Sequence, residues 1–412
     1  MTSADIEGDT TQIEGDAAQI EGDAAQLAED SVLAADIQGF TPRTPVAQAT
    51  SVLLTGATGF VGSFLLRELL ATDLTVHCLV RGDSAEAARE RLLANLEALD
   101  VDVTDVADQI VVVPGDITLE RFGLSETDYQ ALAGRVEAIY HTAAKVNFLT
   151  PYKWLRKATV SGTHEVLRFA CAAAAPLHHV STAGIFNGRT GDNTTPRDEQ
   201  YPTGPADDMP LGYSKAKWVA EELISTARER GVPVTVHRPT QVWGDSRSGA
   251  CQRNDFVWRF VIGSVQAGVY PRNFRLKMNL VPVDYVCAAI VAISRQEAAI
   301  GGNYHEIGPE AIESATIQGF IGAAGYDLKE VSIIKWLKAI SAQGVSNAMF
   351  PLIRTAMLME QEEQPPFGDE VTRGFLRGVG VEGADITCPA IDEVLFAKYA
   401  DYFVRRGYLP AA

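Results

Sequence analysis

Short apolar runs alternate with amphipathic stretches along the first 240 residues of the chain. Six runs have strand length and are rich in Val, Ile and Leu, and four of the five segments between them have apolar residues at helical spacing. The predicted strands are 51–55, 74–80, 109–116, 137–144, 177–182 and 232–239, and the predicted helices are 57–71, 84–99, 152–174 and 213–230. Apolar strands separated by helices are typical of βαβ units, so the pattern predicts an α/β fold with a Rossmann-type, doubly wound parallel sheet.

The pattern becomes less regular after Gly244. Two later segments still have the character of the first half, a long apolar run at 280–293 and the strand-like NYHEIG at 303–308. We therefore predict a nucleotide-binding Rossmann domain over 46–248, to which 280–308 return. The remaining segments, 249–279 and 309–412, are predicted to form a smaller C-terminal subdomain that binds substrate.

The N-terminal segment is acidic and repetitive. Residues 6–26 repeat a seven-residue unit as IEGDTTQ, IEGDAAQ and IEGDAAQ, in which only the first position is strongly apolar and every unit contains glycine. This pattern disfavours a coiled coil. We expect residues 1–45 to form a disordered acidic linker or tail, the alternative being a short segment that orders on a partner.

Charge and cysteine usage exclude several classes of protein. The 412 residues have a net charge of −18, which argues against nucleic acid or an anionic membrane as the main partner. The five cysteines are scattered and the seven histidines lack ligand spacing, so we predict no metal site. With no signal peptide and no apolar run of the roughly 18 residues that a membrane helix needs, we expect a soluble, cytoplasmic protein.

A glycine-rich turn follows the first predicted strand. In Thr55-Gly-Ala-Thr-Gly-Phe-Val-Gly62, Gly56 permits the tight turn, Gly59 lets the backbone approach a pyrophosphate, and Gly62 lets the helix pack closely. The phosphates would meet the N–H groups at the start of the helix. We therefore predict a dinucleotide site. Its predicted residues here and after the third and fourth strands are Gly56, Thr58, Gly59, Phe60, Val61, Gly62, Asp116, Ile117, Ala143, Ala144 and Lys145.

The residue at the end of the second predicted strand determines whether NAD or its 2′-phosphorylated form, NADP, is bound. An acidic residue there would bind the ribose 2′-hydroxyl of NAD, but this chain has Arg81, with Arg91 in the next helix. Arg81 can bind a 2′-phosphate with two hydrogen bonds, and Arg91 can add a second charge. The alternative is two solvated arginines, which suits Arg91 better than Arg81. The sequence therefore predicts NADPH.

A candidate acid–base group follows downstream. Tyr213 and Lys217 are four residues apart and share one helix face, where an ammonium group favours the phenolate and can hold the nicotinamide ribose. Thr182 closes the fifth predicted strand, and its hydroxyl can polarise a substrate carbonyl. We prefer Thr182 to Ser181, although a hydroxyl at a strand end can also simply satisfy the backbone. Tyr213, Lys217 and Thr182 are the predicted catalytic residues, and the first two also contact the cofactor.

Taken in order, these motifs resemble the extended short-chain dehydrogenase/reductase family. Within it the chain is most similar to the thioester reductase domains of nonribosomal peptide synthetases, polyketide synthases and carboxylic acid reductases. The shared motifs beyond the glycine turn are Gly115-Asp116, His141–Asn147, Pro151-Tyr152, Thr182, Tyr213/Lys217, Arg238–Gly249, Asn254-Asp255-Phe256 and Val281–Tyr285. One departure is Thr159, which stands where relatives often carry an Asn that assists a proton relay.

The resemblance implies NADPH-dependent reduction of an acyl or peptidyl thioester, held on the phosphopantetheine arm of a carrier protein, to an aldehyde and possibly on to an alcohol. An acidic carrier needs a basic docking patch on this acidic chain. The two candidate patches are Lys153, Arg156 and Lys157, and Arg272, Arg275 and Lys277. Alternative functions are a fatty acyl-CoA reductase, a nucleotide-sugar epimerase or dehydratase, and a catalytically silent NADP-sensing regulator. Arg81 disfavours the nucleotide-sugar epimerase or dehydratase, which usually holds NAD. The intact Tyr/Lys pair disfavours the NADP-sensing regulator.

Overall fold

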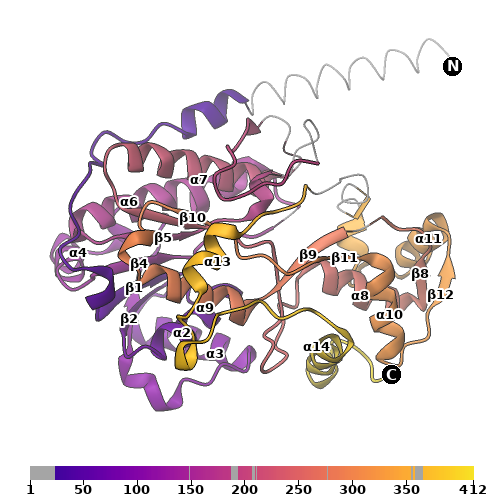
Figure 1. The fold of residues 1–412 in the computed structure, drawn as a ribbon. Helices are drawn as coiled ribbons and strands as arrows, with labels where there is room; N and C mark the ends of the chain where they lie inside the picture. The colour runs from indigo at the N-terminus through magenta and orange to yellow at the C-terminus, as the bar shows by residue number, and fades with distance from the viewer. Residues whose placement is uncertain are drawn as a thin grey trace, which may run out of the picture.

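A seven-stranded parallel sheet forms the centre of the molecule (Figure 1). The computed structural model describes residues 24–412 apart from 148, 187–193, 207–208, 210, 276, 354–355 and 358–364. The strand order is β10-β6-β5-β4-β1-β2-β3, which confirms the predicted doubly wound sheet. The strands are β1 (Ser51–Thr55), β2 (Thr75–Val80), β3 (Ile110–Pro114), β4 (Ala138–His141), β5 (Leu177–Val180), β6 (Val234–His237) and β10 (Asn303–Tyr304).

Helices cover both faces of this sheet because its side chains alternate between two apolar cores. In β1, Val52 and Leu54 belong to one core and Leu53 to the other. The first core contains side chains of α2 (Phe60–Leu70), α3 (Ala85–Ala98) and α9 (Val283–Ser294), and the second those of α4 (Glu126–Ala133), α5 (Tyr152–Arg156), α6 (Gly162–Ala173) and α7 (Gly212–Glu229). The single helix predicted over 152–174 is interrupted by one π-helical turn at Lys157–Ser161, a feature found mostly at functional sites.

Most of the C-terminal elements gather at one side of the sheet, whereas α13 (Glu370–Leu376) lies beside α9; all of them share the sheet's first core (Figure 1). Aromatic stacking holds them together: the rings of Trp243 and Trp258 lie 5.2 Å apart, and Trp258 and Phe403 4.5 Å apart. The strands are β7 (Gln241–Trp243), β8 (Val269–Pro271), β9 (Lys277–Pro282), β11 (Ala311–Glu313) and β12 (Lys329–Val331). The helices are α8 (Phe256–Ala267), α10 (Ser314–Ala323), α11 (Ile333–Gln343), α13 (Glu370–Leu376) and α14 (Glu393–Arg405).

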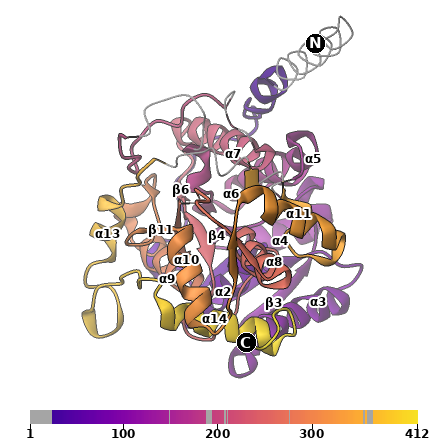
Figure 2. The same cartoon turned by 90° about the vertical axis from the view of Figure 1, so that its right-hand side faces the viewer.

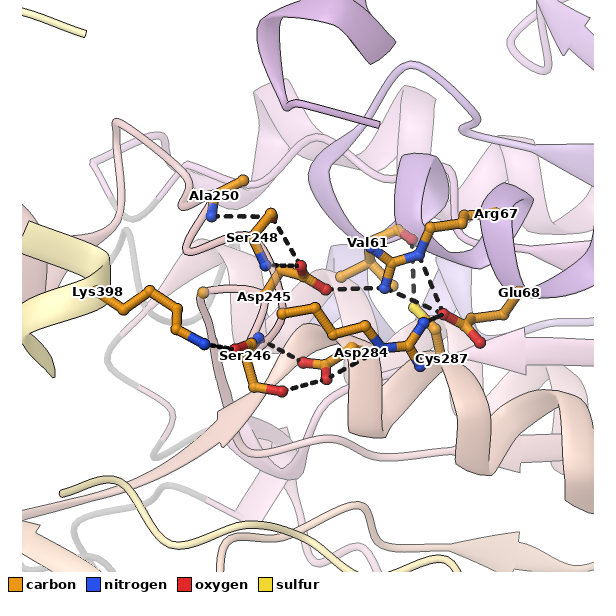
Figure 3. A network of polar contacts seen from close by, with 12 residues as sticks. Val61, Arg67, Glu68, Asp245, Ser246, Ser248, Ala250, Asp284, Cys287 and Lys398 are labelled. Carbon is orange, nitrogen blue, oxygen red and sulfur yellow. Dashed lines mark hydrogen bonds and ion pairs between the residues drawn. The ribbon is translucent and has the colours of Figure 1, made fainter. Parts of the chain in front are cut away.

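A polar network joins α2 to the segment that follows β7 (Figure 3). Arg67 of α2 donates a 2.8 Å hydrogen bond to the fully buried Asp245, which also accepts from the N–H and hydroxyl of Ser248 at 2.7 Å. Burial opposes ionisation of Asp245, but the Arg67 guanidinium holds its pKa below the usual range. Arg247 reaches back to Glu68 of α2 at 3.1 Å. These ion pairs fix α2 against the segment that follows β7.

Residues 24–45 pack against the sheet and its helices. The prediction that residues 1–45 form a disordered linker or tail is therefore wrong for residues 24–45. Leu27, Leu33 and Ile37 are buried in the same core as α6 and α7. Asp30 forms an ion pair with Arg156 and accepts a 2.5 Å hydrogen bond from Tyr152. Three apolar residues among acidic neighbours suffice to anchor the segment, which a composition-based reading overlooks. The repeats at 6–23 lie outside the described residues.

Among the described residues, none of the helices combines the length and the apolar character required to cross a bilayer.

Candidate active site

The glycine turn after β1 has the close backbone packing that a phosphate-binding loop requires. Gly56 has a φ of +82°, and a Cβ there would lie 2.5 Å from Thr142 Oγ1 and 2.6 Å from the Ala143 nitrogen. A Cβ on Gly62 would lie 2.0 Å from the Gly56 carbonyl oxygen. Only glycine fits at both positions, and α2 begins at Phe60 with its free N–H groups at the turn.

A cavity of about 520 Å³ opens beside this turn. Ten predicted cofactor residues line it: Gly56, Thr58, Gly59, Arg81, Arg91, Asp116, Ile117, Ala143, Ala144 and Lys145. The cavity also includes residues that were not predicted to bind the cofactor: Leu79, Val80, Gly115, Thr118, Thr142, Val146 and Ala158. Most of these flank the predicted residues at the carboxyl ends of β2, β3 and β4, where ligands bind in open parallel sheets, so strand position alone could have indicated them.

Five predicted cofactor residues do not line this cavity: Phe60, Val61, Gly62, Tyr213 and Lys217. Gly62 is buried against the turn, so it shapes the loop without forming its wall. Tyr213 and Lys217 lie on α7, and their contact with a cofactor stays a prediction.

The cavity has the charge distribution that a phosphorylated cofactor requires. Arg81 and Arg91 line one part of it with exposed side chains, and Lys145 lines another. Asp116 accepts a 2.8 Å hydrogen bond from the Thr118 N–H. It follows β3, so it does not occupy the position after β2 at which an acidic residue would bind the ribose 2′-hydroxyl. The residues present therefore fit a dinucleotide, whose phosphates carry negative charge.

Tyr213 lies in the first turn of α7. The helix begins at Gly212, which packs on α5 so closely that a Cβ would lie 2.5 Å from the Tyr152 nitrogen. Tyr213 is partly buried, and burial raises the pKa of its phenol to about 12. The phenol is therefore neutral at physiological pH, which is the form that can donate a proton.

Lys217 is buried one turn further along α7, and its Nζ donates a 2.6 Å hydrogen bond to the Val180 carbonyl at the end of β5. Burial lowers the pKa of the ammonium to about 8, while the negative charge of Glu221 opposes this shift. The ammonium acts on its surroundings in turn: burial and the Lys217 charge lower the pKa of His141 to about 3. Lys217 thus supplies a buried positive charge at the end of β5.

The pH dependence of reduction should follow Lys217. We expect kcat/KM for NADPH, which reports the cofactor-free enzyme, to fall as the pH rises through about 8, because the ammonium loses its proton. Since the folded-state pKa of Lys217 lies below the ordinary 10.5, the contribution of this group to stability rises as the pH rises from about 8 to 10.5, so the titration of Lys217 would not itself unfold the protein. A rate that stays constant to pH 10, with the fold intact by circular dichroism, would contradict this assignment.

The two hydroxyls after β5 have different partners. The buried Ser181 hydroxyl donates to Glu221 of α7. Thr182 is only partly buried, and its Oγ1 accepts a 3.1 Å hydrogen bond from the Gly184 N–H, which does not use the hydroxyl proton. This difference favours Thr182 as the residue that can donate to a substrate oxygen.

Thr159 lies within the π-helical turn that precedes α6. Its backbone carbonyl accepts a 2.6 Å hydrogen bond from the Thr163 hydroxyl, whereas its own Oγ1 is buried without a hydrogen-bond partner in the described part of the chain. The described residues hold no cluster of His, Cys, Asp or Glu that could bind a metal ion.

Comparison with known proteins gives consistent matches. Residues 54–290 match the model of the NAD-binding family described as male sterility protein. The terminal R domain of the myxalamid PKS-NRPS biosynthetic pathway is 35% identical, with a TM-score of 0.85, over 94% of this chain and 99% of that one.

Curated relatives are much longer proteins. One component of the linear gramicidin synthase of Brevibacillus parabrevis is 36% identical over 377 residues, which are 88% of this chain and 7% of the relative. Isonitrile lipopeptide synthase of Streptomyces coeruleorubidus is 33% identical over 92% of this chain and 26% of its own length. The chain thus spans only a small part of these relatives.

Proposed function

The chain belongs to the male sterility protein family, as an NAD(P)-dependent reductase of the extended short-chain dehydrogenase/reductase type, and on that premise we propose that it releases a carrier-bound acyl or peptidyl thioester as an aldehyde. The observation that carries this proposal is the neutral Tyr213 phenol, one helical turn from the buried Lys217 ammonium, on a helix whose first residue packs on α5. This arrangement suits the delivery of a proton to a carbonyl oxygen as its charge develops.

Thr182, Tyr213 and Lys217 each have a distinct role in the proposed reaction. A reduced nicotinamide cofactor held in the cavity would supply the hydride for the thioester carbonyl carbon. Thr182 and Tyr213 then donate hydrogen bonds to the oxygen on which negative charge develops, and Tyr213 transfers its proton there. Lys217 stabilises the resulting phenolate. The hemithioacetal collapses to the aldehyde and the free phosphopantetheine thiol, and a second round of the same chemistry would yield the alcohol.

A fatty acyl-CoA reductase would use the same residues, so the thiol that carries the acyl group is the discriminating feature. We expect the enzyme to oxidise NADPH with an acyl group on its carrier protein far more efficiently than with the same acyl group on N-acetylcysteamine or coenzyme A. Mass spectrometry of the product would identify aldehyde or alcohol. Equal efficiency with coenzyme A would instead favour the acyl-CoA reductase, and no reduction of any thioester would reject the proposed function.

We propose NADPH as the cofactor, with Arg81 as the residue that selects it. Arg81→Asp removes a charged hydrogen-bond donor to the 2′-phosphate and adds repulsion. Such a bond contributes about 1.5–3 kcal/mol, so NADPH should bind about 10- to 100-fold more weakly while NADH is little affected. Fluorescence titration of both cofactors would measure this. The matched control is Arg89→Asp, an exposed arginine of α3 that does not line the cavity. Equal use of both cofactors by the unmodified enzyme would contradict the proposal.

A further inference from the structure

An exposed aromatic side chain marks an unassigned surface on α5. Trp154 is 66% exposed, and within the described ranges it is the one aromatic residue among the exposed large hydrophobic side chains. Val146 and Leu149, which precede it, are 62% and 48% exposed, and the Lys153 ammonium lies 5.7 Å from the Trp154 ring centre. The three exposed apolar side chains lie close together along the chain, and a group of such side chains indicates an interaction site. We call the surface formed by Val146, Leu149, Lys153, Trp154 and Lys157 the α5 face.

The α5 face is basic within an acidic chain. Residues 143–161 contain four cationic side chains and no acidic one, although the whole chain has 53 acidic residues and a net charge of −18. Arg156 is already paired with Asp30 of the N-terminal segment, whereas Lys153 and Lys157 are exposed on the same short stretch. The charge therefore fits an acidic partner, and Trp154 provides the kind of apolar anchor found at interface hot spots.

The α5 face lies between the cofactor cavity and the catalytic helix. Lys145 and Val146 line the cavity, and Ala158, directly after Lys157, lines it as well. On the other side, Gly212 packs on the backbone of Pro151 and Tyr152, one residue before Tyr213. Figure 2 shows α5 and α7 close together beneath the N-terminal segment. A partner bound to this face would therefore hold its prosthetic arm beside both reacting groups.

We propose that the α5 face docks the acidic carrier domain, with Trp154 as its apolar anchor and Lys153 and Lys157 as its charge contacts. This inference rests on the proposed function and names the surface through which the thioester arrives. Docking raises the effective concentration of the tethered acyl group at Tyr213. The other basic patch is less suited, because Arg272 is paired with Glu330 at 3.4 Å and lies after β8, at the end of the molecule away from the cofactor-binding sheet (Figure 1).

Steady-state kinetics of the full chain can test this surface. Trp154→Ala, and separately the double variant Lys153→Glu with Lys157→Glu, should each raise KM for the carrier-bound thioester at least about tenfold, as loss of a hot spot does. Both should leave kcat/KM for the N-acetylcysteamine thioester and the melting temperature unchanged. The matched control is Arg275→Glu with Lys277→Glu, which makes the same charge change on the other patch. Added salt should mimic the lysine variants by screening.

The outcomes separate failure of this inference from failure of the proposed function. If the unmodified enzyme reduces the carrier-bound thioester and all variants keep its KM, the docking surface is refuted while the function stands. If the control variant has the larger effect, the carrier docks on the other patch and the inference is also refuted. Self-association of the chain that Trp154→Ala abolishes, with unchanged carrier kinetics, would make the α5 face an interface between two copies and would overturn it.

Discussion

Replacing Tyr213 by Phe is expected to lower the turnover of any thioester by about 10²- to 10⁴-fold, because a positioned general acid contributes a factor of that size. The substitution removes only the phenolic oxygen from the first turn of α7, so the packing of Gly212 on α5 and the cofactor cavity stay in place. NADPH should therefore bind with nearly unchanged affinity. Stopped-flow measurement of NADPH oxidation, together with a fluorescence titration, would separate the two effects.

Two further variants serve as comparisons for Tyr213→Phe. Tyr326→Phe, which removes a hydroxyl that donates to the Pro410 carbonyl on the C-terminal side, should retain full turnover. Lys217→Ala should lower both turnover and cofactor affinity, since the ammonium is predicted to serve the ribose as well as Tyr213. Near-normal turnover of Tyr213→Phe would show that another group supplies the proton.

Replacing Glu221 by Ala should lower the free energy of unfolding by about 3–5 kcal/mol, the cost of leaving one partner of a buried ion pair without its counter-charge. The Glu221 and Arg238 side chains are only 5% and 4% exposed, and Arg238 donates to the carboxylate from Nε at 3.0 Å and from an Nη at 2.5 Å. The same carboxylate accepts from Ser181. Denaturant unfolding would measure the loss.

Controls on α7 test whether the Glu221 effect is specific. Glu229→Ala removes an exposed carboxylate from the last turn of the same helix and should change stability by less than about 0.5 kcal/mol. Because the negative charge of Glu221 raises the pKa of Lys217, any folded Glu221→Gln enzyme should lose activity at a lower pH than the unmodified enzyme. An unchanged alkaline limb would show that Glu221 serves the fold and not the Lys217 charge.

Local pattern predicted the elements that carry the chemistry. The helix predicted over 57–71 begins in the structure at Phe60, and the one over 213–230 is α7 at Gly212–Glu229. The helix α4 was not predicted, because its eight residues, ETDYQALA, offer little more than two turns of apolar spacing. Nine of the ten predicted cofactor residues that line the cavity follow a strand, and parallel strands end at one edge of the sheet; the tenth, Arg91, lies on α3.

The N-terminal segment shows where local pattern is insufficient. Its composition predicts disorder, yet Ile37 is fully buried, and Asp30 pairs with an arginine 126 residues further along the chain. The same contact withdraws Arg156 from a patch that the sequence presents as three equivalent cations. Neither contact can be predicted from local sequence, since neither depends on the spacing of residues that are close together in the chain.

The sequence by itself determined the parallel sheet, the glycine turn and the shared helix face of Tyr213 and Lys217, because strand and helix periodicity are properties of a few consecutive residues. Only the tertiary structure decided which of two adjacent hydroxyls stays available. The sequence favoured Thr182 over Ser181 without showing a partner for either hydroxyl; in the structure Glu221, 40 residues away, accepts the Ser181 proton. Periodicity specifies the direction in which a side chain points, whereas its partner depends on which distant element packs there.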